Sequence, residues 1–135
     1  MTDFDNSTIR KITPAGAVST LAGTAGSRAS TDGIGTEARF AAPTGIATDS
    51  FGNIYVTEAF WDWSAFLPYK NVDTVRKIDQ AGRVSTLAGA ASLWGNEDGI
   101  GSEARLWGPG GIAADSVGNA CVVDTWNNRV RKISA

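Results

Sequence analysis

Short hydrophobic runs that alternate with polar residues recur along this chain, and glycine-rich segments separate them. In TVRKI (74–78), Val75 and Lys77 fall on one face of an extended segment, whereas Arg76 and Ile78 fall on the other. Because this alternation predicts a β-strand and neither face is purely polar, we expect a sheet packed between neighbouring sheets. DSFGN (49–53) and DSVGN (115–119) predict tight turns, since Gly adopts a positive φ and Asp hydrogen-bonds its own backbone. The pattern therefore predicts a turn-rich, all-β fold.

The hydrophobic runs belong to a long internal repeat. The paired copies are VSTLAG at 18–23 and 84–89, DGIGTEARF at 32–40 and DGIGSEARL at 98–106, and PTGIATD at 43–49 and PGGIAAD at 109–115. These pairs are offset by 66 residues, but the VRKI copies at 75–78 and 130–133 are only 55 apart. The difference of 11 residues equals the length of FWDWSAFLPYK (60–70). The repeat is therefore about 55 residues long, and residues 60–70 are an insertion into one copy.

Each repeat contains four short strand patterns, which is typical of a β-propeller blade with four antiparallel strands. PGGIAADSVGNACVVD (109–124), followed by NNRVRKI (127–133), resembles the NHL repeat family of β-propellers. The DGxGxxAR[FL] connectors are similar to a long-loop variety of that family. The resemblance covers nearly all of the chain outside the insertion and implies a propeller, usually of six blades. It implies no single function, because one fold serves many activities.

The blade pattern predicts how the chain is divided. We expect the third and fourth strands of a split blade at 1–23, a connector at 24–43, a full blade at 44–89, a connector at 90–109, and the first three strands of another blade at 110–135. Two repeats cannot close a ring, so the chain is expected to assemble with itself or to be a fragment. Three copies would give six blades and are favoured over a dimer or tetramer. In such a ring, residues 9–12 and 130–133 compete for one strand position.

The amino-acid composition excludes several kinds of binding site and catalytic chemistry. The net charge is −2 and the pI is about 5.0, which gives no basic surface for nucleic acid or an anionic membrane. One Cys excludes an intramolecular disulfide, and the absence of His removes the commonest metal ligand and acid–base residue. We therefore expect no catalytic residues, no metal site and no cofactor. The resemblance includes a zinc-dependent amidating lyase, but its His ligands have no counterpart here, and a Ca²⁺-dependent lactonase type also fits poorly.

Aromatic residues gather in the segments that are expected to share one face of the propeller. The candidate ligand-binding residues there are Trp61, Trp63, Phe66, Tyr69, Trp94, Trp107 and Trp126. Exposed aromatic rings on a platform suit stacking on a sugar, a peptide or another small flat ligand. Alternatively, Trp94 and Trp107 serve with Phe40 and Leu106 as packing for the long connectors, and the insertion contacts a sister chain.

Other motifs favour structural roles. The DGIG segments at 32–35 and 98–101 lack the lysine of a phosphate loop and the clustered carboxylates of a Ca²⁺ loop, so they predict turns. Each following EAR triplet predicts one helical turn, capped by Thr36 or Ser102, with its Arg paired to a carboxylate. Glu58 and Asp124 end strands near the aromatic face, where a metal site is an alternative. Cys121 lies in a buried strand pattern and predicts inert packing.

Three functional classes are compatible with these features. The first is a non-catalytic, self-assembling propeller scaffold, which needs only the repeats, the open flanks and the aromatic face. The second is a lectin-like binder of carbohydrate or peptide, and the third is an enzyme. The first is favoured, because no catalytic constellation is visible in the residues.

Deletion of residues 60–70 is expected to leave the blade folded, because the second copy of the repeat lacks this segment. Circular dichroism and urea unfolding would measure the effect. An unfolded variant, or one with a changed oligomeric state, would show that the segment is part of an interface instead of a dispensable loop.

Overall fold

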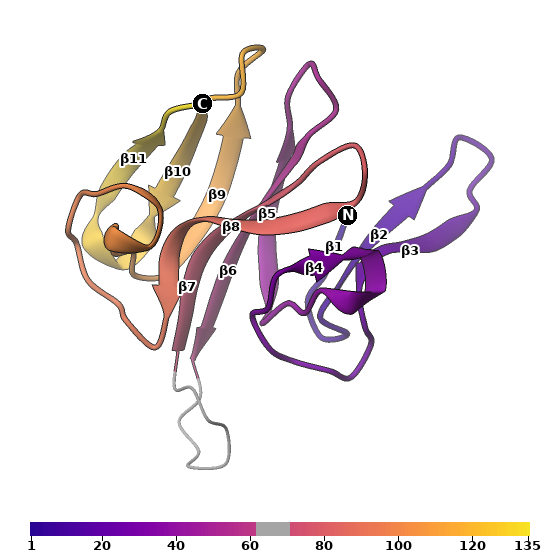
Figure 1. Ribbon diagram of the computed structural model, residues 1–135, viewed down its shortest axis with the longest axis horizontal. Helices are drawn as coiled ribbons and strands as arrows, with labels where there is room; N and C mark the ends of the chain where they lie inside the picture. Colours follow the sequence, from indigo (N-terminus) through magenta and orange to yellow (C-terminus); the bar gives the residue numbers. More distant parts are fainter. Residues whose placement is uncertain (62–70) are drawn as a thin grey trace.

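A computed structural model describes residues 1–61 and 71–135, and these residues form three antiparallel sheets (Figure 1). The first sheet has β1 (Thr2–Asp3), β2 (Thr8–Ile12) and β3 (Val18–Gly23). The middle sheet has β4 (Gly33–Ile34), β5 (Pro43–Thr48), β6 (Ile54–Trp61), β7 (Asn71–Ile78) and β8 (Arg83–Ala91). The third sheet has β9 (Pro109–Ala114), β10 (Ala120–Asp124) and β11 (Arg129–Ile133). The prediction of an all-β fold of antiparallel propeller blades is confirmed.

The middle sheet contains one strand that the sequence pattern did not predict. Its order is β4-β8-β7-β6-β5, so the four consecutive strands β5 to β8 form a meander. β4 comes from the preceding connector and pairs with the outer edge of β8, with Gly33 opposite Val84. Two residues are too few to give a recognisable alternation, which is why this short strand was missed.

The first sheet also contains an unexpected strand, because β1 pairs with β2 through Thr2↔Ile9 and Asp3↔Thr8. The same register occurs in the third sheet, where Val123 lies opposite Val130. Residues 2–12 thus correspond to residues 123–133 at an offset of 121, which is the sum of the 66- and 55-residue spacings. At equivalent positions the two segments share only one Asp, one Asn, one Arg, one Lys and one Ile, so the sequence similarity is too weak to reveal the strand.

The innermost strands approach closely because they carry glycine and small residues. A Cβ atom at Gly45 of β5 would collide with the carbonyl oxygen of Gly110 in β9. The Thr57 hydroxyl lies between them: it accepts from the Gly45 N–H at 2.8 Å and donates to the Gly110 carbonyl at 2.6 Å. The Thr2 hydroxyl donates to the Thr44 carbonyl at 2.8 Å in the equivalent position. Each hydroxyl therefore links one sheet to the first strand of the next.

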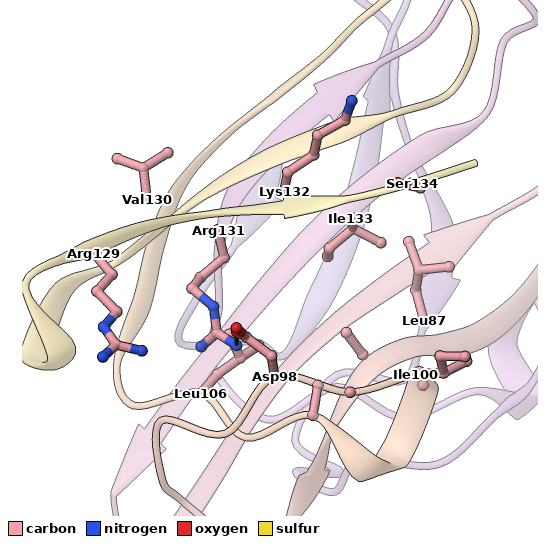
Figure 2. Close-up of a pocket in the computed structure, with 14 residues that line it drawn as sticks. Leu87, Asp98, Ile100, Leu106, Arg129, Val130, Arg131, Lys132, Ile133 and Ser134 are labelled. Atoms are coloured by element: carbon pink, nitrogen blue, oxygen red, sulfur yellow. Dashed lines mark hydrogen bonds and ion pairs between the residues drawn. The ribbon is translucent and has the colours of Figure 1, made fainter.

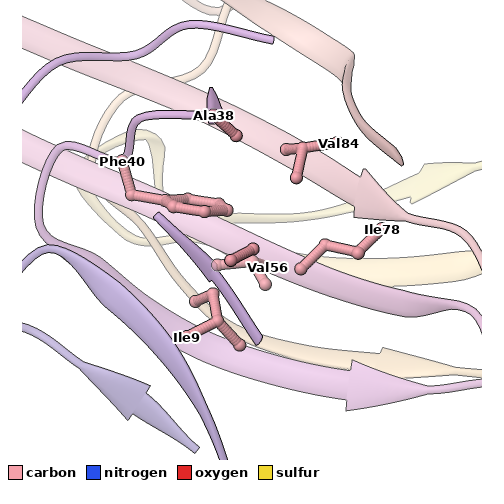
Figure 3. Close-up of a cluster of buried hydrophobic side chains, with 7 residues drawn as sticks. Ile9, Ala38, Phe40, Val56, Ile78 and Val84 are labelled. Atoms are coloured by element: carbon pink, nitrogen blue, oxygen red, sulfur yellow. The ribbon is translucent and has the colours of Figure 1, made fainter. Parts of the chain in front are cut away.

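Two hydrophobic cores fill the spaces between the sheets. The first contains Ile9, Ala22, Ala38, Phe40, Val56, Ile78 and Val84, all essentially buried (Figure 3). The second contains Val75, Ala88, Leu106 and Val122, with Leu87, Ile112 and Ile133 packed against them. Phe40 and Leu106 occupy equivalent places in the repeat, so both connectors use the hydrophobic residue that follows the EAR triplet as interior packing. Val84 of the first core has no counterpart in the second.

The connectors follow the predicted turns with different local chemistry. Gly35–Glu37 and Gly101–Glu103 form 3₁₀ turns that lack a side-chain cap, so the predicted Thr36 and Ser102 caps are wrong. The Arg39 guanidinium donates to the carbonyls of residues 36–38 instead of to a carboxylate. Without a full helical turn, these carbonyls have no N–H partner four residues later, and the guanidinium takes that place.

Cys121 is exposed, so the prediction that it is buried is wrong. In β10, buried and exposed residues alternate strictly, and Cys121 and Val123 fall on the exposed face. This face has no neighbouring sheet among the described residues. In the part of the chain that the structure describes, no helix has the length and hydrophobicity required to cross a lipid bilayer.

Candidate functional site

Each sheet pairs an acidic side chain on one strand with an arginine on the next strand. Asp3 and Asp124 are the last residues of β1 and β10, whereas Glu58 lies within β6, so the prediction that Glu58 ends a strand is wrong. The pairs are Asp3–Arg10 at 3.5 Å, Glu58–Arg76 at 2.9 Å and Asp124–Arg131 at 2.9 Å. Glu58 and Arg76 are completely buried, and Asp124 is buried as well. A buried charge requires both a counter-ion and hydrogen bonds, because desolvation is otherwise very costly.

Hydrogen bonds saturate the Glu58 carboxylate. The Ala41 N–H donates to Oε1 at 2.6 Å, and the hydroxyls of Ser30 and Thr74 donate to Oε2 at 2.8 and 2.7 Å. Arg76 completes the set at 2.9 Å. Glu58 therefore anchors the connector between the first and middle sheets. The alternative of a metal site here has no support, since the carboxylate is fully engaged by protein donors.

The aspartate of each DGIG motif is the second acidic partner of the arginine. Arg76 donates to Asp32 at 2.7 Å, and Arg131 donates to Asp98 at 2.5 Å. In the middle sheet, the Thr86 hydroxyl of β8 also donates to Asp32, at 2.9 Å. Partial burial raises the pKa of Asp32, but the hydrogen bonds from Thr86 and the charge of Arg76 outweigh burial and leave the pKa below its usual value. The DGIG segments thus attach the connectors to the blades.

The two turn aspartates behave as predicted. Asp49 accepts hydrogen bonds from the backbone N–H groups of Phe51 and Asn53, both at 2.9 Å. Asp115 accepts from Val117 and Asn119 in the same way, at 3.0 and 2.8 Å. The hydrogen bonds from the Asn119 side chain and backbone lower the pKa of Asp115 despite the opposing effect of desolvation. These aspartates shape the turns opposite the aromatic end of the sheets.

Four tryptophans come together where β6, the second connector and β10 end. The ring centroid of Trp107 lies 4.8 Å from Trp94, 6.0 Å from Trp126 and 6.1 Å from Trp61. Trp94 and Trp126 remain 53% and 63% exposed, whereas Trp107 is half-buried between them. We refer to Trp61, Trp94, Trp107 and Trp126 as the tryptophan cluster. Trp63, Phe66 and Tyr69, the other candidate ligand-binding residues, lie outside the described residues.

Two buried carboxylates hold the backbone beneath the tryptophan cluster. The Trp107 N–H donates to Asp124 at 2.8 Å, and the Gly108 N–H donates to Asp73 at 2.7 Å. The Trp126 ring lies against Gly108, because a Cβ atom there would overlap the indole. Gly108 has φ +63°, so both its conformation and its contact with Trp126 favour glycine. The connector is thereby fixed at the residues that carry the aromatic rings.

Asp73 has the most unusual environment of these carboxylates. Burial raises its pKa, and the nearby charge of Asp124 raises it further, although hydrogen bonds from Asn71 and Gly108 act in the opposite direction. The repeat pattern gives no signal for Asp73, because no equivalent acid occurs in the other repeats: the counterparts are Ser7 and Asn128. Among residues 1–61 and 71–135, no three acidic or cysteine side chains lie together as a metal site.

Replacement of Asp73 by Asn is expected to change how stability depends on pH. A carboxyl group whose pKa is raised on folding contributes stability at low pH, and this contribution is lost as the pH rises through the folded-state pKa. The Asp73→Asn variant should therefore gain stability relative to the unmodified protein as the pH rises above the ordinary value of 3.8. Urea unfolding at a series of pH values would measure the difference, with Asp5→Asn on the exposed turn as the control. A difference that does not change with pH would contradict the assignment.

Comparison with known proteins identifies the repeat. Residues 42–57 match the β-propeller repeat family and residues 106–133 match the NHL repeat family. The chain is 34% identical over 102 residues to the chloroplastic protein SUPPRESSOR OF QUENCHING 1 of Arabidopsis thaliana, covering 76% of this chain and 9% of that protein.

Solved structures agree over nearly the whole length of the chain. A protein of unknown function from Bacteroides thetaiotaomicron superposes with a TM-score of 0.82 at 32% identity, covering 98% of this chain and 31% of that one. An auxiliary nutrient binding protein from Bacteroides ovatus gives a TM-score of 0.69 at 24% identity, covering 96% and 33%. The chain thus spans about a third of these structures. Its fold is that of β-propeller blades, and it contains an NHL repeat at residues 106–133.

Proposed function

We propose that this chain is a non-catalytic propeller scaffold that associates with further copies of itself through the flank of its third sheet. The observation that carries the proposal is the exposure of Val123 and Val130, which are 45% and 71% exposed. Their counterparts in the middle sheet, Thr57 and Val75, are completely buried against the neighbouring sheet. An apolar surface that is interior packing in one repeat is therefore open to solvent in the next.

Three copies are the number that the lengths favour. The chain covers 31% and 33% of the two propeller structures compared above, so three copies would match either one in length. A head-to-tail ring closes only if the rotation between copies returns to its start, and blades around one axis satisfy that condition. Burial of Val123, Val130 and Cys121 at the junction would remove apolar surface from water at roughly 25 cal/mol per Å².

The expected mass in solution is three times 14.1 kDa. Light scattering coupled to size exclusion would measure it over a range of concentrations. Val130→Lys should reduce or abolish association, because it places a charge in the junction. The matched control is Val117→Lys, since Val117 is also exposed, at 60%, but lies on the turn of β9 and β10. A well-folded chain of 14.1 kDa at every concentration would contradict self-association.

The tryptophan cluster supports a second candidate function, the binding of carbohydrate. The Trp126 ring packs against Gly108 and is 63% exposed, and Trp94 in the same cluster is 53% exposed. A flat, supported indole presents a face on which the C–H groups of a sugar ring can stack. Polar groups lie close to these rings in the chain. The side chain of Asn127, next to Trp126, donates to the Gly95 carbonyl at 2.7 Å, and the Glu97 carboxylate accepts from the Asn96 N–H in the connector that carries Trp94.

Calorimetric titration with a panel of neutral oligosaccharides would test this second function. Trp126→Ala is expected to weaken binding about tenfold or more, which corresponds to a loss of ~1.4 kcal/mol of stacking and burial. Phe51→Ala is the control, because Phe51 is 57% exposed but lies in the turn at the opposite end of the sheets. Silence across the panel, or equal affinities of both variants, would exclude the carbohydrate hypothesis.

A further inference from the structure

An open groove of about 770 Å³ follows the free edge of β11 (Figure 2). Arg131 and Ile133 point from β11 into this groove, whereas Val130 and Lys132 point away from it. The opposite wall is the second connector, with Asp98 and Ile100. Within the described residues, the third sheet ends at β11, so the backbone groups along this edge have no strand partner.

In the middle sheet, the equivalent space is filled by a strand. β8 lies between β7 and β4, with Val84 opposite both Ile78 and Gly33. The counterpart of β7 is β11, and the counterpart of β4 is Gly99–Ile100, which lies 66 residues further along. The groove therefore has the two walls of a strand site, and the strand between them is missing.

The groove also lacks one hydrogen-bond donor. Asp32 in the middle sheet is held by Arg76 and by the Thr86 hydroxyl of β8. Asp98 in the third sheet is held by Arg131 alone among the side chains described, and its own side chain is 88% exposed. A carboxylate positioned by a half-buried arginine is thus open toward the groove. A threonine at the position of Thr86 would complete the same set of contacts.

One hydrophobic side chain is missing as well. Val84 of β8 is 1% exposed in the first core, where it packs with Ala38, Phe40 and Ile78. The residues equivalent to Ala38, Phe40 and Ile78 in the next repeat are Ala104, Leu106 and Ile133, and all three line the groove. Ile100 on the opposite wall is 86% exposed. A valine at the position of Val84 would cover these side chains.

The chain carries a strand with this chemistry in β3. Residues 18–23 are Val-Ser-Thr-Leu-Ala-Gly, identical to residues 84–89. β3 pairs with β2 alone among the described strands, and Val18 is 53% exposed. Resting on the self-association proposed above, we propose that β3 of a second copy occupies the groove, with Val18 opposite Ile133 and Thr20 bound to Asp98.

An exchange between two similar strands makes this pairing feasible. β3 already pairs with Arg10, Lys11 and Ile12 of β2, and β11 offers Arg131, Lys132 and Ile133 in the same register. Replacement of β2 by β11 beside β3 therefore keeps these three paired side chains, whereas Arg129 and Val130 would replace Thr8 and Ile9. The exchange adds the backbone of Gly99–Ile100 on the other side of β3 and the Asp98 carboxylate for Thr20. Val130, 71% exposed, would take the buried position of Ile9, and residues 1–12 would be displaced.

Fluorescence anisotropy with a labelled peptide of residues 16–24 tests the groove directly. The peptide should bind the full chain, and Ile100→Lys should abolish binding without unfolding the protein, because Ile100 is 86% exposed. Asp98→Ala in the chain and Thr20→Val in the peptide should each weaken binding about tenfold. The two changes together should cost little more than either one, because they remove the same contact. Asp5→Ala and a scrambled peptide are the controls. Absence of binding under dilution that leaves the chain monomeric by light scattering, or additive losses, would overturn the proposal.

A crosslinking experiment identifies the second copy as the source of the strand. In a Cys121→Ser background, chains with Val18→Cys are mixed with differently tagged chains carrying Ile133→Cys and are mildly oxidised. Disulfide-linked pairs of the two tags should form in large excess over the self-linked products of either chain alone. If the protein assembles without such pairs, and Ile100→Lys leaves its mass unchanged, this proposal fails while self-association stands. If the peptide binds but the chain remains at 14.1 kDa, self-association fails and a second copy is not the occupant.

Discussion

The buried pair of Glu58 and Arg76 is the constraint on which the arrangement of the blades depends. Both side chains are completely buried, so the cost of desolvation has to be offset by an almost complete set of hydrogen bonds. The pair and its hydrogen-bond partners come from β6, β7 and the preceding connector. A single ion pair thereby fixes two neighbouring strands and the long segment that crosses between sheets. The same pair recurs as Asp124–Arg131 in the third sheet.

Buried carboxylates also position the backbone at the aromatic end of the molecule. Asp124 is held by Arg131 and in turn holds the backbone of Trp107, and Asp73 holds Gly108. The rings of Trp107 and Trp126 are thus positioned by backbone contacts that are themselves anchored in a buried network.

Differences between equivalent positions are more informative here than the similarities. Val75 and Val130 have the same side chain and the same strand position, but Val75 is buried and Val130 is 71% exposed. Asp32 and Asp98 are both exposed, at 54% and 88%, but only Asp32 also accepts a hydrogen bond from a threonine on the neighbouring strand β8. Val130 and Asp98 share one flank and one groove of the third sheet. A repeat protein is stabilised by the contacts between neighbouring repeats, so residues suited to such a contact indicate what the missing neighbour must provide.

Residue patterns along the chain predict the period of the repeats and the order of the four strands in the full blade. They also predict that Trp94, Trp107 and Trp126 lie at one end, because antiparallel strands alternate in direction and every second connection lies at the same end. Local patterns carry no information about β4, about Asp73 or about the exposure of Cys121. β4 is two residues long, Asp73 acquires its environment from Gly108 and Asp124, and the exposure of Cys121 depends on whether a sheet lies opposite β10. These features depend on contacts between residues distant in the chain, and only the packing of whole sheets against one another decides them.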